Sequence, residues 1–451
     1  MVAIRHIDLA TAEPTQNAEI SPMARKAAVS SALGTSLEWI DFAAYGAISA
    51  TVLPALFFPA MNPNSALLAS FATFGVGFFA RPAGGVIVSL LGDRYGRKRV
   101  LLFTLILMGA ASFLIGALPT YESVGVWAPI GLVLLRFVQG FALGGEATGA
   151  QLLTLEHAPD NRRGLFGAFI NMAAPLSQVL SNALLFAISA AMTAEQFLHF
   201  GWRIPFLLSV LLVFVGLYIR SKVEESPAFE QLKRSQAPVV AKEGHVVPKT
   251  SLLRDHGSMI VRLILFWAAP AACFWVVAVF SLSWMTKTVG VSAQTAFLCL
   301  MAANAVAVVT TFMGGMASDR FGRKPTLIAL ALIMFAISLT YFPLVATGNP
   351  ILIFVAMAVF AGTIQAQSGI LPAFFAEPFP TSVRYAGSAF AYTGANLLFA
   401  GPAPFVAAWL MGLSGGQVWV LTTLCFVLST ISFVSLLTIP ESSKLSLNRE
   451  D

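Results

Sequence analysis

The chain has 451 residues, of which 57% are hydrophobic and only 11% charged, and its mean hydropathy is +0.80. A soluble domain of this composition would expose large apolar patches to water, so the composition excludes a soluble globular protein and predicts an integral membrane protein. The net charge of +6 comes from cations in short loops between apolar segments, not from the basic face with interleaved aromatic residues that a nucleic-acid-binding protein presents.

Twelve apolar segments are long enough to cross a bilayer, which takes about 20 residues of α-helix. They form two groups of six, and we expect a first bundle at 30–219 and a second at 258–440. A polar stretch at 220–257 is interpreted as a central loop, and 1–29 and 441–451 as terminal tails. The expected spans are 30–58, 67–91, 99–118, 126–155, 165–190, 202–219, 258–285, 292–316, 326–346, 350–375, 383–410 and 417–439.

The distribution of Lys and Arg indicates the orientation of these spans. If the N-terminus is cytoplasmic, most of the cations fall on the cytoplasmic side, as the positive-inside rule requires. An even number of spans brings the two chain ends to the same side. We therefore expect both termini in the cytoplasm.

The spans of the first half place three acids and two arginines at membrane depth, and the second half has no comparable set. An ionisable side chain at mid-bilayer costs about 3 kcal/mol, so each needs a reason to be there. One reason is a structural network of ion pairs between helices. The other is transport: a desolvated carboxylate loads and releases a proton, while an arginine keeps its charge and binds a substrate carboxylate or holds a neighbouring acid ionised. The proton-coupling candidates are Asp41, Glu38, Glu146 and Arg136, with the acids in that order of preference, and Arg81 joins Arg136 as a candidate for substrate binding.

Uncharged polar and aromatic residues also recur on single faces of the spans. Asn171 and Gln178 lie seven residues apart on span five, and Tyr392 and Asn396 lie four apart on span eleven. Such residues either form hydrogen bonds between helices or line a wet central cavity. The substrate-binding candidates of this kind are Gln139, Asn171, Gln178, Trp275, Gln365, Tyr392 and Asn396.

Two motifs occur twice, at matching places in the two halves. "GDRYGRK" (92–98) and "SDRFGRK" (318–324) place Asp93 and Asp319 226 residues apart, half the length of the chain. "EHAPDNRRGLFGAF" from Glu156 and "EPFPTSVRYAGSAF" from Glu377 share a Glu-x-x-Pro-x-x-x-Arg pattern. This repetition indicates an internal duplication, the architecture of one large class of secondary transporters.

These motifs resemble those of the major facilitator superfamily. Its loop motif, Gly-x-x-x-Asp-Arg-x-Gly-Arg-Lys, is complete from Gly315 to Lys324, whereas the first copy has Ser89 in place of the leading glycine. Arg136-Phe-Val-Gln139-Gly140 is similar to the fourth-span motif of the superfamily. The stretches "LEWIDFAAYG" (37–46), "FATFGVGFFARPAGG" (71–85), "LRFVQGFALGGE" (135–146) and "GWRIPF" (201–206) resemble the metabolite:proton symporter family in particular.

The resemblance implies a twelve-helix secondary transporter of the bacterial inner membrane, expected to be monomeric. It implies proton-coupled uptake of a small carboxylate-bearing metabolite, anionic in our expectation. Uptake of a zwitterion such as proline or betaine, and proton-driven export, remain alternatives. We find no constellation typical of an enzyme, a cofactor site or a metal site, and the three cysteines lie within apolar runs without ligand spacing.

The resemblance also assigns a role to the repeated motifs. In the superfamily, their acids and arginines hold neighbouring helices together at the cytoplasmic gate, whereas the simpler alternative is a solvated loop that only enforces topology. An acid near a helix N-terminus and a cation near a helix C-terminus are both favoured by the helix dipole. The gating candidates are Asp93, Arg94, Arg97, Asp319, Arg320, Arg323, Glu156, Arg163, Glu377 and Arg384.

Overall fold

A computed structural model describes residue 36 and residues 39–95, 97–144, 154–155, 158–222 and 249–443. Every regular element in this part of the chain is helical. Helices satisfy the backbone hydrogen bonds of a segment internally, which is what a chain of this hydropathy requires in lipid. Many large apolar side chains face outwards, among them Phe79, Leu90, Trp127, Phe214, Ile351 and Leu413. Such a surface suits contact with lipid rather than with water.

The helices follow the predicted order. The first half contains a helix at 39–51, α2 (Leu53–Phe57), α3 (Pro63–Tyr95), α4 (Arg97–Ala117), α5 (Tyr121–Val124), α6 (Trp127–Leu143), α8 (Arg163–Asn171), α9 (Ala173–Ala191), α10 (Ala194–His199) and α11 (Ile204–Lys222). The second half contains α13 (Lys249–Phe266), α14 (Ala268–Trp275), α15 (Ser281–Trp284), α16 (Ala293–Phe321), α17 (Arg323–Ala346), α18 (Pro350–Ala376), α19 (Arg384–Ala395), α20 (Ala403–Leu413) and α21 (Trp419–Thr438).

Two of these long helices contain π-helical turns. Val276–Phe280 and Met285–Val289 interrupt the helix that begins with α13 and α14, and Asn396–Ala400 lies between α19 and α20. Eight helical segments in the described residues are long and apolar enough to cross a membrane, and three shorter apolar helices accompany them. Together with the helix at 39–51, they overlap all twelve ranges expected from the sequence.

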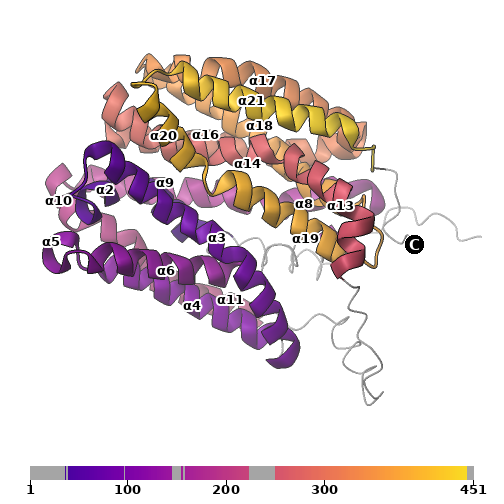
Figure 1. Cartoon of the computed structure of the whole chain (residues 1–451), viewed down its shortest axis with the longest axis horizontal. Helices are drawn as coiled ribbons and strands as arrows, with labels where there is room; N and C mark the ends of the chain where they lie inside the picture. The colour runs from indigo at the N-terminus through magenta and orange to yellow at the C-terminus, as the bar shows by residue number, and fades with distance from the viewer. Residues whose placement is uncertain are drawn as a thin grey trace, which may run out of the picture.

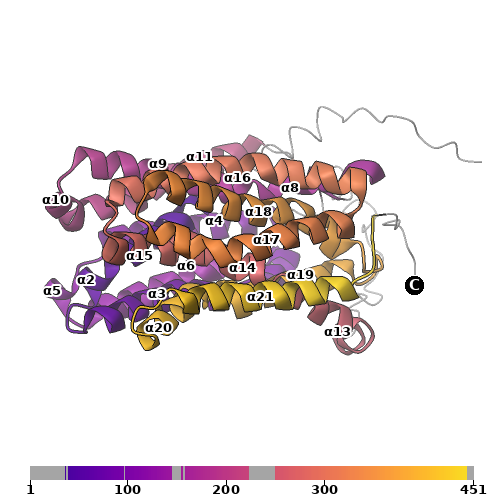
Figure 2. The ribbon, with the colours of Figure 1, turned by 90° about the horizontal axis from the view of Figure 1, so that it is seen from above.

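The two halves of the chain form two groups of helices. In Figure 1 the helices of the first half, from indigo to magenta, lie mostly below those of the second half, from red to yellow. Helices α8 and α9 run along α16 at the boundary, as Figure 2 also shows. The side-chain amide of Gln294 on α16 donates to the carbonyl of Ser189 on α9 (2.9 Å) at one end of this contact. The carboxylate of Asp319 meets α8 at the other end.

Glycines let the helices inside each group approach closely. A Cβ atom on Gly84 or Gly140 would overlap the backbone of the facing helix in the pair α3–α6. The same holds for Gly314 and Gly369 in the pair α16–α18. These pairs are the second and fourth spans of each half, so the same packing device occurs at equivalent places, as expected for a duplicated chain.

The helices bounding the central loop extend further than hydropathy predicted. Helix α11 continues to Lys222, and α13 begins at Lys249, nine residues before the expected start of the second bundle at 258. Hydropathy detects only the apolar part of a helix. The backbone hydrogen bonds of the helix can continue through polar residues beyond that part.

Candidate functional site

Three of the charged residues predicted in the spans gather among the helices of the first half. Asp41 lies on the helix at 39–51 and is 2% exposed, and Arg136 on α6 is fully buried. Arg81 on α3 is partly buried. The glycine packing between α3 and α6 makes room for them: Gly77 faces the Arg136 guanidinium so closely that a Cβ atom would lie 3.1 Å from its Nε.

Two neutral side chains extend from Arg136 towards Asp41. Arg136 Nη1 donates to Gln139 Oε1 (2.5 Å), and Gln139 Nε2 donates to Ser112 Oγ on α4 (2.8 Å). Ser112 also lies close enough to Asp41 to act on its carboxylate. Gln139, predicted to bind substrate, is fully buried and occupied by this chain of bonds. Sequence reasoning missed Ser112, because a single serine in an apolar span carries no distinguishing signal.

Aromatic rings surround both guanidinium groups. Arg81 lies 4.4–5.0 Å from the ring centroids of Trp39, Phe42 and Phe78. The Arg136 guanidinium lies 3.9 Å from the centroid of Phe42, on which both arginines therefore converge. Cation–π attraction at a desolvated ring contributes about 2 kcal/mol and compensates in part for burying the charges. Further rings at Tyr45 and Phe74 lie against Arg136.

The second half of the chain reaches this cluster through two of the predicted residues. Trp275 of α14 stacks on Trp39 with a centroid distance of 6.4 Å and contacts Phe42 edge-on. Tyr392 of α19 lies close enough to Arg81 for the two side chains to interact electrostatically. The cluster therefore lies at the boundary between the two groups of helices.

Several polar atoms in this cluster lack hydrogen-bond partners in the described part of the chain. They are Nε and Nη2 of Arg81, Nε and Nη2 of Arg136, and Oδ1 of Asp41. A buried donor left without an acceptor costs about 1–3 kcal/mol, and more when it is charged. A guanidinium can only donate, so the partner that it lacks is an acceptor, and a carboxylate matches its geometry.

The other predicted polar residues lie in helix contacts. Asn171 on α8 donates to the carbonyl of Ser368 on α18 (2.6 Å), across the boundary. Gln178 is buried, and its carbonyl oxygens accept from Asn182 one turn on. Asn396 donates to the carbonyl of Tyr392 at the start of the π-helical turn (2.8 Å).

Gln365 on α18 stands apart from these residues. It is 3% exposed, and its Oε1 has no partner among the described residues. A buried amide oxygen of this kind is an acceptor available to a ligand or to water.

The second copy of the loop motif forms a network at one end of the molecule, called the motif end. Asp319, near the C-terminus of α16, accepts hydrogen bonds from the backbone N–H groups of Gly164 and Leu165 (2.8 and 2.9 Å). Both N–H groups lie in the first turn of α8, where they have no acceptor within the helix. The helix dipole also favours a carboxylate at this position. Gly164 is required for this approach, since a Cβ atom there would meet Asp319 and the backbone of Gly315.

Arg323 links this contact to the second repeated motif. Its guanidinium binds Asp319 (2.5 Å) and Glu377 (3.1 Å). Arg163 of α8 lies 3.9 Å from the same Glu377 oxygen. The network therefore joins the two halves of the chain at two points. Asp319 of the second half accepts from the backbone of α8, and Arg163 of the first half lies against Glu377. Arg320, by contrast, is exposed and lies over the ring of Phe321.

The residues that follow α21 are bound to this network, although we assigned 441–451 to a terminal tail. Glu441 accepts from the backbone N–H groups of Arg323 (3.0 Å) and Lys324 (2.8 Å), at the start of α17. Ser442 donates to Glu377 (2.6 Å). Burial opposes the charge of Glu441, but the backbone donors of Ser443, Lys324 and Arg323 outweigh it and lower the pKa of Glu441 below its ordinary value.

The remaining candidates contribute less to the site. Arg384 is buried at the first position of α19. Glu38, Glu146 and Glu156 lie outside the described residues, as do the side chains of Asp93, Arg94 and Arg97. Within the described ranges, no three His, Cys, Asp or Glu residues are grouped to hold a metal ion.

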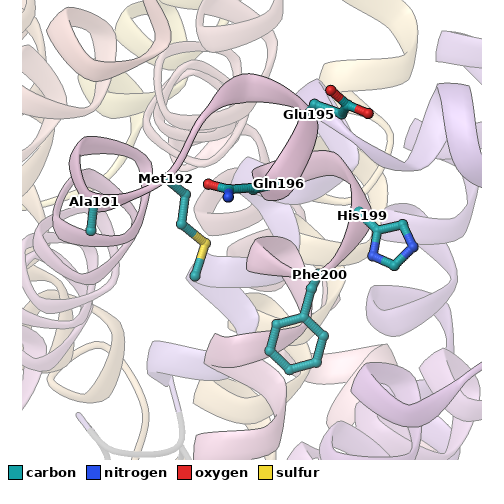
Figure 3. Close-up of a pocket in the computed structure, with 6 residues that line it drawn as sticks. All are labelled: Ala191, Met192, Glu195, Gln196, His199 and Phe200. Atoms are coloured by element: carbon teal, nitrogen blue, oxygen red, sulfur yellow. The ribbon is translucent and has the colours of Figure 1, made fainter.

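A pocket of about 540 Å³ lies away from both clusters, at the turn between α9 and α10. Figure 3 shows its lining: Ala191, Met192, Glu195, Gln196, His199 and Phe200. None of the predicted site residues lines this pocket, and it opens on the end of the molecule opposite to the motif end.

Comparisons with known proteins agree with this architecture. The sequence profile described as "Sugar (and other) transporter" matches residues 27–450. The chain is 36% identical to the inner membrane metabolite transport protein YhjE of Escherichia coli over 391 residues, 85% of this chain and 87% of that protein. It is also 36% identical to the shikimate transporter of Escherichia coli, over 87% of this chain and 89% of that one.

Another relative is named for different substrates. The glycine betaine/proline/ectoine/pipecolic acid transporter OusA of Dickeya dadantii is 35% identical, over 86% of this chain and 77% of that one. Among solved structures, the proton:xylose symporter XylE of the major facilitator superfamily matches with a TM-score of 0.72 at 17% identity, over 95% of this chain and 98% of that one. The chain therefore belongs to the sugar (and other) transporter family, a family of multi-pass membrane transporters and not of enzymes, and it has the fold of the major facilitator superfamily.

Proposed function

We propose that the protein is a proton-coupled symporter that carries a small carboxylate-bearing metabolite into a bacterial cell across the inner membrane. The proton gradient supplies the driving force, and transporters of this kind need no cofactor. In this proposal twelve spans form two bundles of six, the motif end faces the cytoplasm, and the bundles rock about a central site. Export on the same fold, driven by the proton gradient, is the opposite use of the same cycle.

The observation that carries the proposal is a pair of arginines beside the buried Asp41. Arg136 is fully buried and Arg81 partly buried, and Nε and Nη2 of both have no hydrogen-bond partner among the described residues. Arg81 and Arg136 offer donors that only an acceptor satisfies, and a substrate carboxylate is such an acceptor. Oδ1 of Asp41 has no hydrogen-bond partner in the described ranges and can take a proton. Neutralising Asp41 would leave the two cations in place, so protonation and the binding of an anion are coupled by charge. The relatives named for shikimate and for proline and betaine transport both move molecules that carry a carboxylate.

Uptake into proteoliposomes tests this proposal. The panel would be radiolabelled shikimate, citrate, α-ketoglutarate, benzoate, proline and glycine betaine, each with and without an inward proton gradient. We expect one carboxylate-bearing compound to accumulate only with the gradient. Asp41→Asn should abolish that accumulation but retain exchange of labelled for unlabelled substrate, because exchange requires no net proton movement. Arg320→Gln, which removes an exposed cation, is the matched control. Equilibration that ignores the gradient would refute proton coupling.

A second candidate within this proposal is a zwitterion that carries both a carboxylate and a quaternary or secondary ammonium group. The rings of Trp39, Phe42 and Phe78 already hold one cation, the Arg81 guanidinium, at 4.4–5.0 Å. Aromatic rings grouped in this way bind ammonium ligands by the same attraction. Accumulation of betaine or proline but not of shikimate would favour the zwitterion. Trp39→Leu should then weaken uptake of betaine more than that of proline.

We also propose that the network at the motif end is a gate. Its support is geometric: Asp319 and Glu377 belong to one half of the chain, and their partners Gly164, Leu165 and Arg163 belong to the other. Bonds of this kind persist only while the two bundles are closed at that end. They therefore stabilise one conformation of the transport cycle relative to the other.

A further inference from the structure

We propose that Asn171 is a positioning residue for transport: its side-chain amide replaces a backbone donor that α18 lacks at Pro372, and so fastens a break in this helix to the first half of the chain. The contacts that carry the proposal lie within the protein itself. Its consequence for transport rests on the proposed function, because it concerns the closing of the motif end. Asn171 acts on the shape of α18 and does not need to touch the substrate.

Pro372 interrupts the backbone hydrogen bonds of α18. It lies inside this helix, one turn before the helix ends at Ala376. Proline has no backbone N–H, so the carbonyl of Ser368, four residues earlier, receives no donor from position 372. Both residues are buried. Because buried backbone carbonyls are almost always hydrogen-bonded, a donor from elsewhere is expected at Ser368.

That donor comes from the other half of the chain. Asn171 Nδ2 on α8 donates to the carbonyl of Ser368 at a distance of 2.6 Å. A backbone carbonyl only accepts hydrogen bonds, so the NH₂ group of Asn171 and not its oxygen must face it.

A second contact places the proline itself against α8. A Cβ atom on Gly167 would lie 3.1–3.3 Å from three ring atoms of Pro372, so the glycine makes room for the ring. Asn171 follows Gly167 by four residues, about one turn of α8. The same turn of α8 therefore faces both the proline ring and the carbonyl that the proline leaves without its helical donor.

The position of the break along α18 gives it a role in transport. Gln365, which we predicted to bind substrate, precedes Ser368 by three residues, and Glu377 of the network at the motif end follows the helix directly. Helices bend most sharply at proline, so the break is a hinge between these two residues. The bond from Asn171 persists only while α8 and α18 stay in contact. It therefore holds the hinge in the shape of the closed end, and separation of the halves releases the segment that carries Glu377.

Hydrogen exchange of α18, measured by mass spectrometry on the purified full-length protein without substrate, tests the inference. Asn171→Leu nearly preserves the size of the side chain but removes the donor. The backbone amides from Ala373 to Glu377, beyond the break, should then exchange about tenfold faster, as expected for the loss of one buried hydrogen bond. Asn171→Ala also removes the donor and replaces the leucine variant if that variant fails to fold.

A second substitution separates the hydrogen bond from simple packing. Pro372→Ala restores an N–H group that can bind the Ser368 carbonyl within α18, so the donor of Asn171 is no longer needed. In that background Asn171→Leu should change the exchange by less than about twofold. An equally large effect of Asn171→Leu with and without Pro372→Ala would show that Asn171 only packs against α18, and would overturn the inference. Unchanged exchange in Asn171→Leu alone would overturn it as well.

Asn182→Leu is the matched control. Asn182 is also buried, but its amide donates to Gln178 one turn back in its own helix. Its effect on the exchange of α18 should therefore be the same with and without Pro372→Ala. A change in that effect would mean that Pro372→Ala alters the protein generally, and the inference would lose its support.

Gradient-driven uptake of shikimate and of betaine is measured on the same preparations. Asn171→Leu should lower the initial rate of uptake severalfold, because the closed motif end is less stable, and an unchanged rate would overturn the role in transport. Exchange that depends on Asn171 only when Pro372 is present, in a protein that ignores the gradient, would refute the proposed function alone. Gradient-driven uptake by a protein whose α18 exchange does not depend on Asn171 would refute this inference alone.

Discussion

Replacing Asp319 by asparagine should release the contact between the two halves at the motif end. The carboxylate accepts two backbone N–H groups of α8, from Gly164 and Leu165, at 2.8 and 2.9 Å. Asparagine is almost the same size but has one acceptor oxygen, and its NH₂ group would face a donor. The bond from Arg323 lies within the second half of the chain, so it is not counted in the contact between the halves.

The magnitude follows from the bonds that cross the boundary. A hydrogen bond to a charged group contributes about 1.5–3 kcal/mol, against about 0.5–1.5 kcal/mol for a neutral pair. Asp319 is 11% exposed, so solvent screens it little. Asparagine would lose one of the two bonds from α8 and turn the other from a charged into a neutral hydrogen bond. The closed arrangement of this end would then lose about 2 kcal/mol, which shifts its equilibrium with the open arrangement roughly thirtyfold.

Spin labels at Asn161→Cys and Phe321→Cys report the separation of the two halves, because both residues are exposed and flank the contact. The native cysteines are all buried. Pulsed and continuous-wave electron paramagnetic resonance should show the long-distance population rising roughly thirtyfold relative to the short one in Asp319→Asn. Arg320→Ala removes an exposed charge from the same motif and should leave the ratio unchanged. Identical distance distributions in Asp319→Asn and the wild type would refute the assignment of this contact to a gate.

Three further predictions, for Gly140, Arg203 and Glu441, are tested by thermal unfolding in detergent. Gly140→Ala should lower stability by about 1–3 kcal/mol, because its Cβ would overlap the backbone of α3, whereas Gly412→Ala meets no atom within 4 Å and should be harmless. Arg203→Met should cost about 1 kcal/mol, since Arg203 donates to the last carbonyls of α4 (2.7 Å to Gly116). The pKa of Glu441 is lowered in the folded state, so its stabilisation is present above the ordinary value of 4.5 and lost as pH falls through the lower folded value. The Tm difference between the wild type and Glu441→Gln should therefore disappear in acid; a difference that persists there would contradict this.

The sequence predicted the helices and the charged residues of the site for the same physical reason. A bilayer requires long apolar segments and makes a charge within them costly. Asp41, Arg81 and Arg136 could therefore be identified as unusual residues within such segments. The repeated motifs identified Asp319 and Arg323, because a pattern written twice at matching positions needs an explanation beyond topology. The positions of the embedded charges were therefore readable, but their partners were not.

Partners depend on contacts between distant segments, which no local pattern records. Asp319 binds backbone groups 155 and 154 residues away, and a backbone donor has no sequence signature. Ser112 is one of many serines in the spans, and only the hydrogen bond that it accepts from Gln139 distinguishes it. The attachment of Glu441 to the start of α17 was also unpredictable, because hydropathy treats a polar residue after the last span as solvated.

The central cluster has one property that alternating access requires. A ligand shifts the equilibrium between two conformations only if it binds one of them better, and this demands contacts with both moving parts. The charges belong to the first half alone: the residue 226 positions after Arg81, at the equivalent place in the second half, is Ala307. The second half nevertheless contributes Trp275, stacked on Trp39, and Tyr392, close to Arg81. A substrate bound at Arg81, as we propose, would therefore lie next to residues of both halves, whereas Asp41, the acid that we propose to load the proton, belongs to the first half alone.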